Sequence, residues 1–265
     1  DGRAVSARAG PRDLSPAGAA RYWRRNATVG RRTILTTLIP RFVEAIAYLA
    51  VMGLGMGAYL TAVDGTDYVT FIAPGVLAST VMFGAIIETT YNAFVRIHVR
   101  RVFEAAITTP LSVPDVVVGE YLWAATRALA YGCVFLVVMT GFGLVHSPWA
   151  LAAVPVMLVG GLMFAVLGML YTAFVSNIEH FNIFYTGVLT PMFLFGGVFF
   201  PFDRLPGWAQ AVGWCLPLSH FVQALRDLVL GGAGWSTAGH VALMAALTAA
   251  LFAVPLGRLD RVLRA

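Results

Sequence analysis

The sequence changes from a long apolar run to a basic, amphipathic segment at residue 95. Phe71–Phe94 reads FIAPGVLASTVMFGAIIETTYNAF, and Arg96–Leu111 reads RIHVRRVFEAAITTPL. The first stretch is long enough to cross a bilayer as a helix that rises about 1.5 Å per residue. The second is basic and amphipathic, so we predict a helix at the membrane surface, within reach of a soluble partner. These two stretches predict a membrane protein, and the partner of the second one decides its function.

The overall composition predicts that most of the chain is surrounded by lipid. Of the 265 residues, 59% are hydrophobic and 12% are charged, and the mean hydropathy is +0.78. All 18 basic residues are Arg, which excludes mechanisms that need a lysine within this chain, such as a Walker A phosphate loop. Nine Arg residues precede residue 42. We attribute the net charge of +5 to attraction for anionic lipid headgroups, and not to nucleic acid.

Apolar runs of sufficient length predict an all-α membrane protein with six transmembrane helices. The predicted spans are 42–60, 71–94, 122–145, 151–174, 181–200 and 238–256. Residues 34–265 would form this membrane domain. Residues 1–33 predict a mobile tail and an interfacial helix, with Ser15 as N-cap and Pro16 in the first turn. A solvated cytosolic helix is the alternative for this segment. Pro201–Trp235 is too polar to cross the membrane, so we expect short re-entrant helices there.

The distribution of Arg predicts the orientation of the spans. Nine Arg lie in the N-terminal region, three in Arg96–Glu120 and three after Gly257. The connections Thr61–Thr70 and Val145–Trp149 contain none. We therefore expect both termini on the cytoplasmic side.

The sequence contains no pattern typical of an enzyme or a metal centre. It has no HExxH motif, no Gly-x-Ser-x-Gly elbow and no close pair of acidic residues inside a span. Two cysteines, Cys133 and Cys215, form neither a disulfide framework nor a metal motif. We predict no catalytic residue and no bound metal.

Three charged residues fall inside predicted spans, where an unpaired charge costs at least about 2.5–3.5 kcal/mol. They are Glu44, Glu88 and Arg127. One hypothesis is a polar entry site for the headgroup of a substrate, extended along the second span by Thr89, Tyr91 and Asn92. The alternative is structural: Arg127 reaches the interface or pairs with a glutamate.

Several blocks of sequence carry a resemblance to a known family. They are Trp23–Asn26, Ala73–Gly75, Glu88–Tyr91, Thr108–Leu111, Asp115–Arg127, Thr190–Pro201, Leu205–Trp208 and Leu216–His220. Together they resemble the ABC-2 class of membrane subunits of ATP-binding-cassette exporters, over nearly the whole chain after residue 20. The Thr190–Pro201 block is typical of the class. The Asp115–Arg127 block resembles the branch that exports lipo-oligosaccharides such as nodulation factors.

The resemblance implies a homodimer in a bacterial inner membrane that works with two copies of a separate ATPase. ATP and Mg would be bound by that partner, and this chain would need no cofactor. The family's ATPase-docking loop corresponds to Arg96, His98, Arg100, Arg101, Phe103, Glu104, Thr108, Thr109 and Pro110. Its re-entrant region corresponds to Pro201, Arg204, Trp208, Pro217 and His220. Spans one, two and five would line the substrate path, for which Glu44, Glu88, Tyr91, Asn92 and Arg127 are the candidates.

We therefore expect the permease subunit of an exporter for a lipo-oligosaccharide or another amphipathic glycolipid, and not an enzyme. A hydrophobic-drug exporter of the same class is the first alternative. A membrane scaffold without a transport function is the second, and it would need no ATPase partner.

Overall fold

The computed structural model describes residues 14–55 and 66–264, without the side chains of Ile107 and residues 262–264. Predictions for the N-terminal tail and for the connection after the first span fall partly outside these ranges. The described chain is helical, as predicted. The elements of its first half are α1 (Pro16–Arg31), α2 (Ile34–Leu54), α3 (Tyr68–Ile87), η2 (Glu88–Asn92), η3 (Val95–Val99), α4 (Val102–Ile107) and α5 (Val113–Gly141).

The second half contains two long helices separated by a series of short ones. Its elements are η4 (Pro148–Ala152), α6 (Ala153–Thr172), α7 (His180–Phe184), η5 (Tyr185–Leu189), α8 (Thr190–Phe195), η6 (Phe202–Arg204), α9 (Gly207–Cys215), α10 (Pro217–Leu230) and α11 (Trp235–Arg264). The elements η2, η3 and η5 are π-helical turns that continue their neighbouring α-helices.

Among the described residues, five helical stretches are long and apolar enough to cross a membrane: Ile34–Leu54, Tyr68–Val99, Val113–Gly141, Pro148–Thr172 and Trp235–Arg261. The run predicted as the fifth of six spans is shorter. There α7, η5 and α8 contribute five, five and six residues, about 24 Å of helix. The run stops at Gly196 and Gly197, and Gly197 adopts a left-handed φ of 72°.

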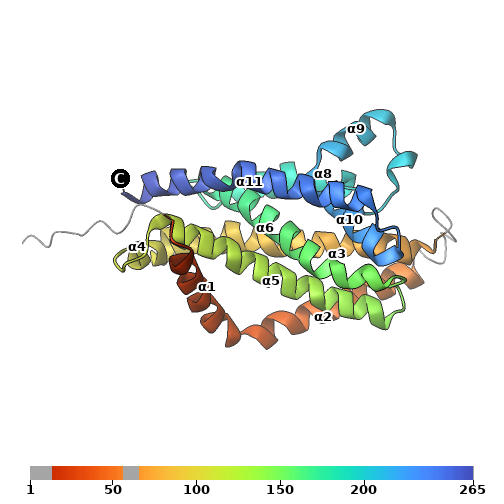
Figure 1. Cartoon of the computed structure of the whole chain (residues 1–265), viewed down its shortest axis with the longest axis horizontal. Coiled ribbons are helices and arrows are strands. Elements are labelled where there is room, and N and C mark those ends of the chain that lie inside the picture. The colour runs from red at the N-terminus through yellow and green to blue at the C-terminus, as the bar shows by residue number, and fades with distance from the viewer. Residues whose placement is uncertain (1–13, 56–65, 265) are drawn as a thin grey trace, which may run out of the picture.

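The long helices lie side by side, and the chain alternates between the two ends of the bundle (Figure 1). One end gathers α1, α4 and the C-terminal end of α11, and we call it the Arg-rich end. The opposite end holds the turn after α5 and the short helices α9 and α10. The alternation agrees with the order of the predicted spans, and the Arg-poor connection Val145–Trp149 lies opposite the Arg-rich loops.

Helix α3 is the centre of the bundle. Its apolar window is 83% buried, whereas those of α2 and α11 are only 11% and 17% buried. Helices α5, α6 and α10 surround α3. At Gly75 of α3 an added Cβ would lie 2.8 Å from the Cα of Val198, so the turn after α8 packs directly onto this glycine. The sequence blocks Ala73–Gly75 and Thr190–Pro201 therefore pack against each other.

Candidate functional site at the Arg-rich end

Glu88 lies where α3 continues into the π-helical turn η2, and its side chain is only 3% exposed. Its Oε1 accepts hydrogen bonds from Arg96 Nη1 at 2.8 Å and from Trp123 Nε1 at 3.1 Å. Its Oε2 accepts from Arg127 Nη1 at 2.6 Å and from Asn92 Nδ2 at 2.9 Å. Two of these donors are guanidinium groups, so the buried carboxylate is compensated in charge and in hydrogen bonds.

Arg96 joins Glu88 to a second buried carboxylate. Its Nη2 donates to Glu120 Oε2 at 2.7 Å and to the backbone oxygen of Glu88 at 3.1 Å. The other oxygen of Glu120 accepts from Tyr22 Oη at 2.9 Å. Burial, reinforced by the charge of Glu120, raises the pKa of Tyr22, so its phenol stays protonated and donates. We call Glu88, Arg96, Glu120 and Arg127 the buried ion cluster.

Two π-helical turns follow one another at this site. They place Asn92 and Arg96, four and eight residues after Glu88, on the same carboxylate. Such turns are rare and are frequently found at functional sites. The second turn ends at Val99 with Arg100 as its C-cap, and Arg101 adopts a left-handed φ of 46° that stops the helix.

Helix α1 lies obliquely across one end of α5 (Figure 1), and its Tyr22 reaches the cluster from there. Ser15 caps α1 and Pro16 occupies its first turn, as predicted. The backbone N–H of Ser15 donates to Asp115 Oδ1 at 2.6 Å, and Asp115 belongs to the capping box of α5. At Gly119 of α5, an added Cβ would meet Tyr22 Cδ1 at 2.7 Å. The small residue thus allows Tyr22 to reach Glu120.

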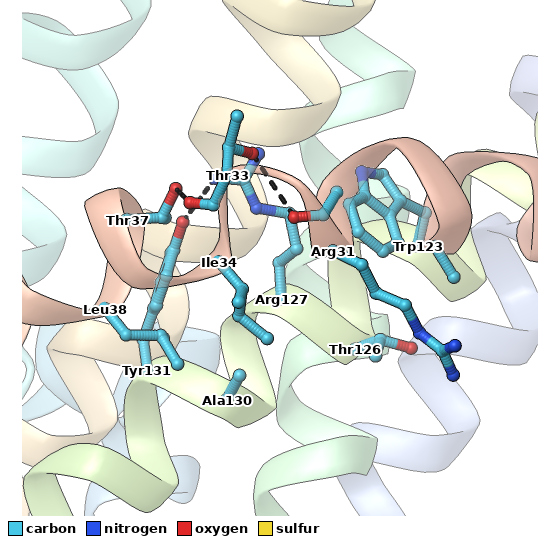
Figure 2. A pocket seen from close by; sticks show the side chains of 12 residues that line it. Arg31, Thr33, Ile34, Thr37, Leu38, Trp123, Thr126, Arg127, Ala130 and Tyr131 are labelled. Carbon is cyan, nitrogen blue, oxygen red and sulfur yellow. Dashed lines mark hydrogen bonds between the residues drawn. The ribbon is translucent and has the colours of Figure 1, made fainter.

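Three cavities border Arg127. The first, the apolar cavity, has a volume of about 200 Å³ between α5 and the start of α2. Figure 2 shows Arg127 and Tyr131 projecting from α5 toward Thr33 and Thr37. The second, the Arg-lined cavity, has about 280 Å³ between α1, the π-helical turns and α5. The third has about 500 Å³ and reaches α2.

The structure brings together three of the five residues predicted for the substrate path. Glu88, Asn92 and Arg127 interact directly. Glu44 lines the third cavity but is exposed, and it pairs with Arg41 at 2.6 Å. Tyr91 points elsewhere: its ring packs on aromatic rings of α7 and η5, with centroid distances of 5.0 and 5.4 Å. Arg127 pairs with Glu88, as the structural alternative predicts, and it also lines all three cavities.

The residues of the predicted docking loop divide into two groups. Arg96 and Phe103 are turned into the bundle, where Phe103 packs on Tyr22. The exposed ones are His98, Arg100, Arg101, Glu104, Thr108, Thr109 and Pro110. The expectation of one surface helix over Arg96–Leu111 is wrong. Residues 96–99 end the second span, and only Val102–Ile107 forms a separate helix.

The residues of the predicted re-entrant region lie at the opposite end. Arg204 and Trp208 are exposed, Pro201 precedes η6, and Pro217 begins α10. His220 lies 3.0 Å from His240, measured between their Nδ1 atoms. Helix α10 itself is largely buried against α3, α6 and α11.

Sequence reasoning missed Tyr22, Glu120 and Trp123 as members of the site. One signal was available for the last two. Glu120, Trp123 and Arg127 follow the spacing i, i+3, i+7, which places them on one face of a helix. Tyr22 had no such signal, because its place depends on how α1 crosses α5.

The fold and the buried ion cluster define a membrane protein with several helical spans and a polar site within the bundle. Residues 20–230 match the ABC-2 type transporter family, and the chain belongs to it. Nodulation protein J of Sinorhizobium fredii is 33% identical over 239 residues, which is 90% of this chain and 91% of that protein. Its counterpart in Rhizobium leguminosarum bv. viciae is 37% identical over 82% of this chain and 85% of its own length. The inner membrane transport permease YadH of Escherichia coli is 25% identical over 76% of this chain and 78% of its own length.

Proposed function

We propose that this chain is the permease subunit of a bacterial exporter that moves a lipo-oligosaccharide or another amphipathic glycolipid out across the inner membrane. The observation that carries the proposal is the meeting of polar and apolar cavities at Arg127. An amphiphile has a polar part and an apolar part, so a polar cavity next to an apolar one suits it. Membership of the ABC-2 type transporter family supports the transport role, and the relatives named nodulation protein J favour this substrate class.

The proposed assembly is a homodimer with two copies of a separate ATPase that binds ATP and Mg. The run from α7 to α8 is the proposed fifth span, which brings the number of spans to six. The short helices η6, α9 and α10 are the proposed re-entrant helices before the last span. Both termini lie in the cytoplasm, because the Arg residues collect at that end of the bundle.

The exposed segment after η3 is the proposed contact with the ATPase. Arg100, Arg101 and Glu104 are exposed there, and Arg96 lies four residues before Arg100, inside the ion cluster. A push on the exposed segment therefore acts directly on a residue that links η3 to α5. Closure of the ATPase dimer is thereby passed to the spans that line the substrate path.

The test is a variant with Arg100→Ala, Arg101→Ala and Glu104→Ala, co-expressed with a candidate ATPase subunit sought among the genes next to this one. We expect the complex to lose substrate-stimulated ATP hydrolysis and transport, while the variant still folds because all three side chains are exposed. A matched control replaces Arg21 and Arg24, which are also exposed but lie on α1. Unchanged coupling in the triple variant would remove the docking role, and absence of any ATPase partner would favour the scaffold.

One observation favours the hydrophobic-drug alternative. A further cavity of about 660 Å³, lined almost entirely by apolar side chains, lies between α6, the α7–α8 run and α11. The two substrates are distinguished by the ligand that stimulates ATP hydrolysis of the reconstituted complex. Stimulation by a lipo-oligosaccharide supports the proposal, and stimulation only by hydrophobic drugs supports the alternative.

A further inference from the structure

The Arg-lined cavity contains more hydrogen-bond donors than the protein can satisfy. Four guanidinium groups border it, those of Arg25, Arg96, Arg100 and Arg127. Arg96 and Arg127 pair with the carboxylates of the ion cluster. Within the described chain, Arg25 and Arg100 lie within 4.0 Å of no carboxylate.

Two further donors in the wall of this cavity are buried and have no acceptor among the described residues: Nδ2 of Asn26 and Nε of Arg96. Asn26 is 7% exposed, and its Oδ1 already accepts from Arg25 Nη1 at 3.2 Å. That bond assigns the oxygen of the amide and leaves the N–H₂ group as the unsatisfied part. Buried polar groups are normally paired, so an unpaired donor here points to an acceptor ligand.

Among the described residues, Glu88 is the one carboxylate that borders the cavity, and it does not oppose an anion there. Both of its oxygens already accept two hydrogen bonds each. Its negative charge is offset by Arg96 and Arg127 together. The hydrogen-bonding groups that remain free in the cavity are therefore donors, and the net charge of its lining is positive. Guanidinium and amide N–H groups in this combination bind phosphate oxygens well.

The apolar cavity adjoins the Arg-lined cavity. The two share Gly30, Thr33, Trp123 and Arg127 as walls, while Ile34, Leu38 and Ala130 line the apolar side. A molecule with an anionic group in the first cavity has a place for a hydrocarbon chain in the second.

We propose that the Arg-lined cavity binds the phosphate group of an anionic amphiphile, whose apolar part lies between α5 and the start of α2. The proposal deepens the proposed function, because it assigns a ligand chemistry to the same two cavities, but lipid binding is measured without ATPase or transport, so the two proposals can fail separately. The same phosphate chemistry is offered by a phospholipid headgroup and by soluble phosphate, and the experiment separates these sources.

The test uses the full chain, purified in a neutral detergent and stripped of lipid. Binding of dioleoyl phosphatidylglycerol, dioleoyl phosphatidylcholine and inorganic phosphate is measured by native mass spectrometry and by the shift in melting temperature. We expect phosphatidylglycerol to bind at least about tenfold more tightly than phosphatidylcholine, which has the same acyl chains but no net charge.

The first variant pair carries Arg25→Gln and Arg100→Gln, two exposed side chains whose loss leaves the core intact. We expect its affinity for phosphatidylglycerol to fall about tenfold or more. The control pair, Arg21→Gln and Arg24→Gln, makes the same change in charge outside the cavity and is expected to bind like the unmodified chain. Equal affinity of the test pair and the unmodified chain would overturn the site, as would equal binding of the two lipids.

A third variant, Asn26→Asp, removes the unpaired amide donor and places a carboxylate beside Arg25 in the wall of the cavity. We expect a higher melting temperature without lipid and loss of the further increase on adding phosphatidylglycerol. Asn177→Asp, an exposed change in the turn between α6 and α7, is the control and should alter neither. If inorganic phosphate binds as tightly as the lipid and needs Arg25 and Arg100, the anion site stands and its ligand is soluble phosphate. A lipid response that persists in Asn26→Asp would contradict the assignment.

Discussion

Glu88 shows what is required to keep a carboxylate inside a membrane helix. It accepts four side-chain hydrogen bonds, two of them from Arg96 and Arg127. Such a pair stabilises little relative to apolar residues, but removal of one partner leaves the other charges buried and uncompensated. The structural role of Glu88 is thus to hold the end of α3 and the middle of α5 in one register. This role is compatible with the cavities that border the cluster.

Replacement of Glu88 by Gln should therefore destabilise the protein by about 3–5 kcal/mol, because two guanidinium groups lose their shared counter-charge. The measurement is the loss of folded protein on size-exclusion chromatography and the drop in melting temperature in detergent. Glu44→Gln is the matched control and should be nearly neutral, since Glu44 is exposed and pairs only with Arg41. Adding Arg127→Gln to Glu88→Gln should recover part of the loss. A Glu88→Gln protein as stable as the Glu44→Gln protein would refute the account.

At the scale of elements, the lengths of the apolar runs predicted where the long helices lie, because only such runs stay in lipid. The adjoining boundaries of the second and third spans differ from the prediction for one physical reason. The prediction placed the start of the third span at residue 122, after Glu120, and the end of the second at residue 94, before Arg96. In the structure Arg96 and Glu120 form an ion pair inside the bundle. Both charged residues can therefore lie within long helices: α5 begins at Val113 and the second span continues to Val99.

Part of the candidate site was accessible from the sequence, and part was not. A charge inside an apolar run is recognisable without a structure, which is how Glu88 and Arg127 were found. The pairing of Arg96 with both glutamates depends on two successive π-helical turns, and no local pattern encodes these. The break at Arg101 was equally hidden, since an Arg with a left-handed φ has no distinctive sequence signal.

The seating of α1 on α5 can be tested at Gly119. An added methyl group would meet Tyr22 Cδ1 at 2.7 Å and the backbone oxygen of Ala19 at 3.0 Å. We expect Gly119→Ala to cost about 1–3 kcal/mol by pushing α1 away from Glu120. Gly141→Ala, at the end of the same helix with no atom within 4 Å, should be neutral or slightly stabilising. Melting temperatures of the two variants decide the matter, and a neutral Gly119→Ala would show that α1 is not closely seated.

At the scale of the whole molecule, the described helices alternate between two ends that differ sharply in charge. The Arg-rich end contains the start of α1, the segment from Arg96 to Pro110 and the tail of α11, whereas the turn after α5 has no Arg. By the positive-inside rule, this asymmetry supports the proposed cytoplasmic location of the Arg-rich end. The extensive exposure of the apolar faces of α2 and α11 suits contact with lipid or with a second subunit.

The orientation is tested by cysteine labelling in a background without Cys133 and Cys215. A cysteine at Thr66 should react with an impermeant maleimide from outside intact cells, and one at Thr108 should react only after the membrane is opened. Thr108 suits this purpose because it is exposed, whereas the nearby Ser112 is buried as the cap of α5. Labelling of Thr108 in intact cells would reverse the topology.

The four hydrogen bonds to Glu88 also bear on whether this carboxylate can exchange protons. Membrane carriers that run on an ion gradient often use an acidic side chain that picks up a proton on one side and releases it on the other. Glu88 has both oxygens occupied by donors, and two of those donors belong to arginines that keep their charge throughout the physiological range. Protonation of Glu88 would break at least one of these hydrogen bonds and leave two guanidinium charges without their shared counter-charge. The arrangement around Glu88 therefore disfavours proton exchange at this carboxylate.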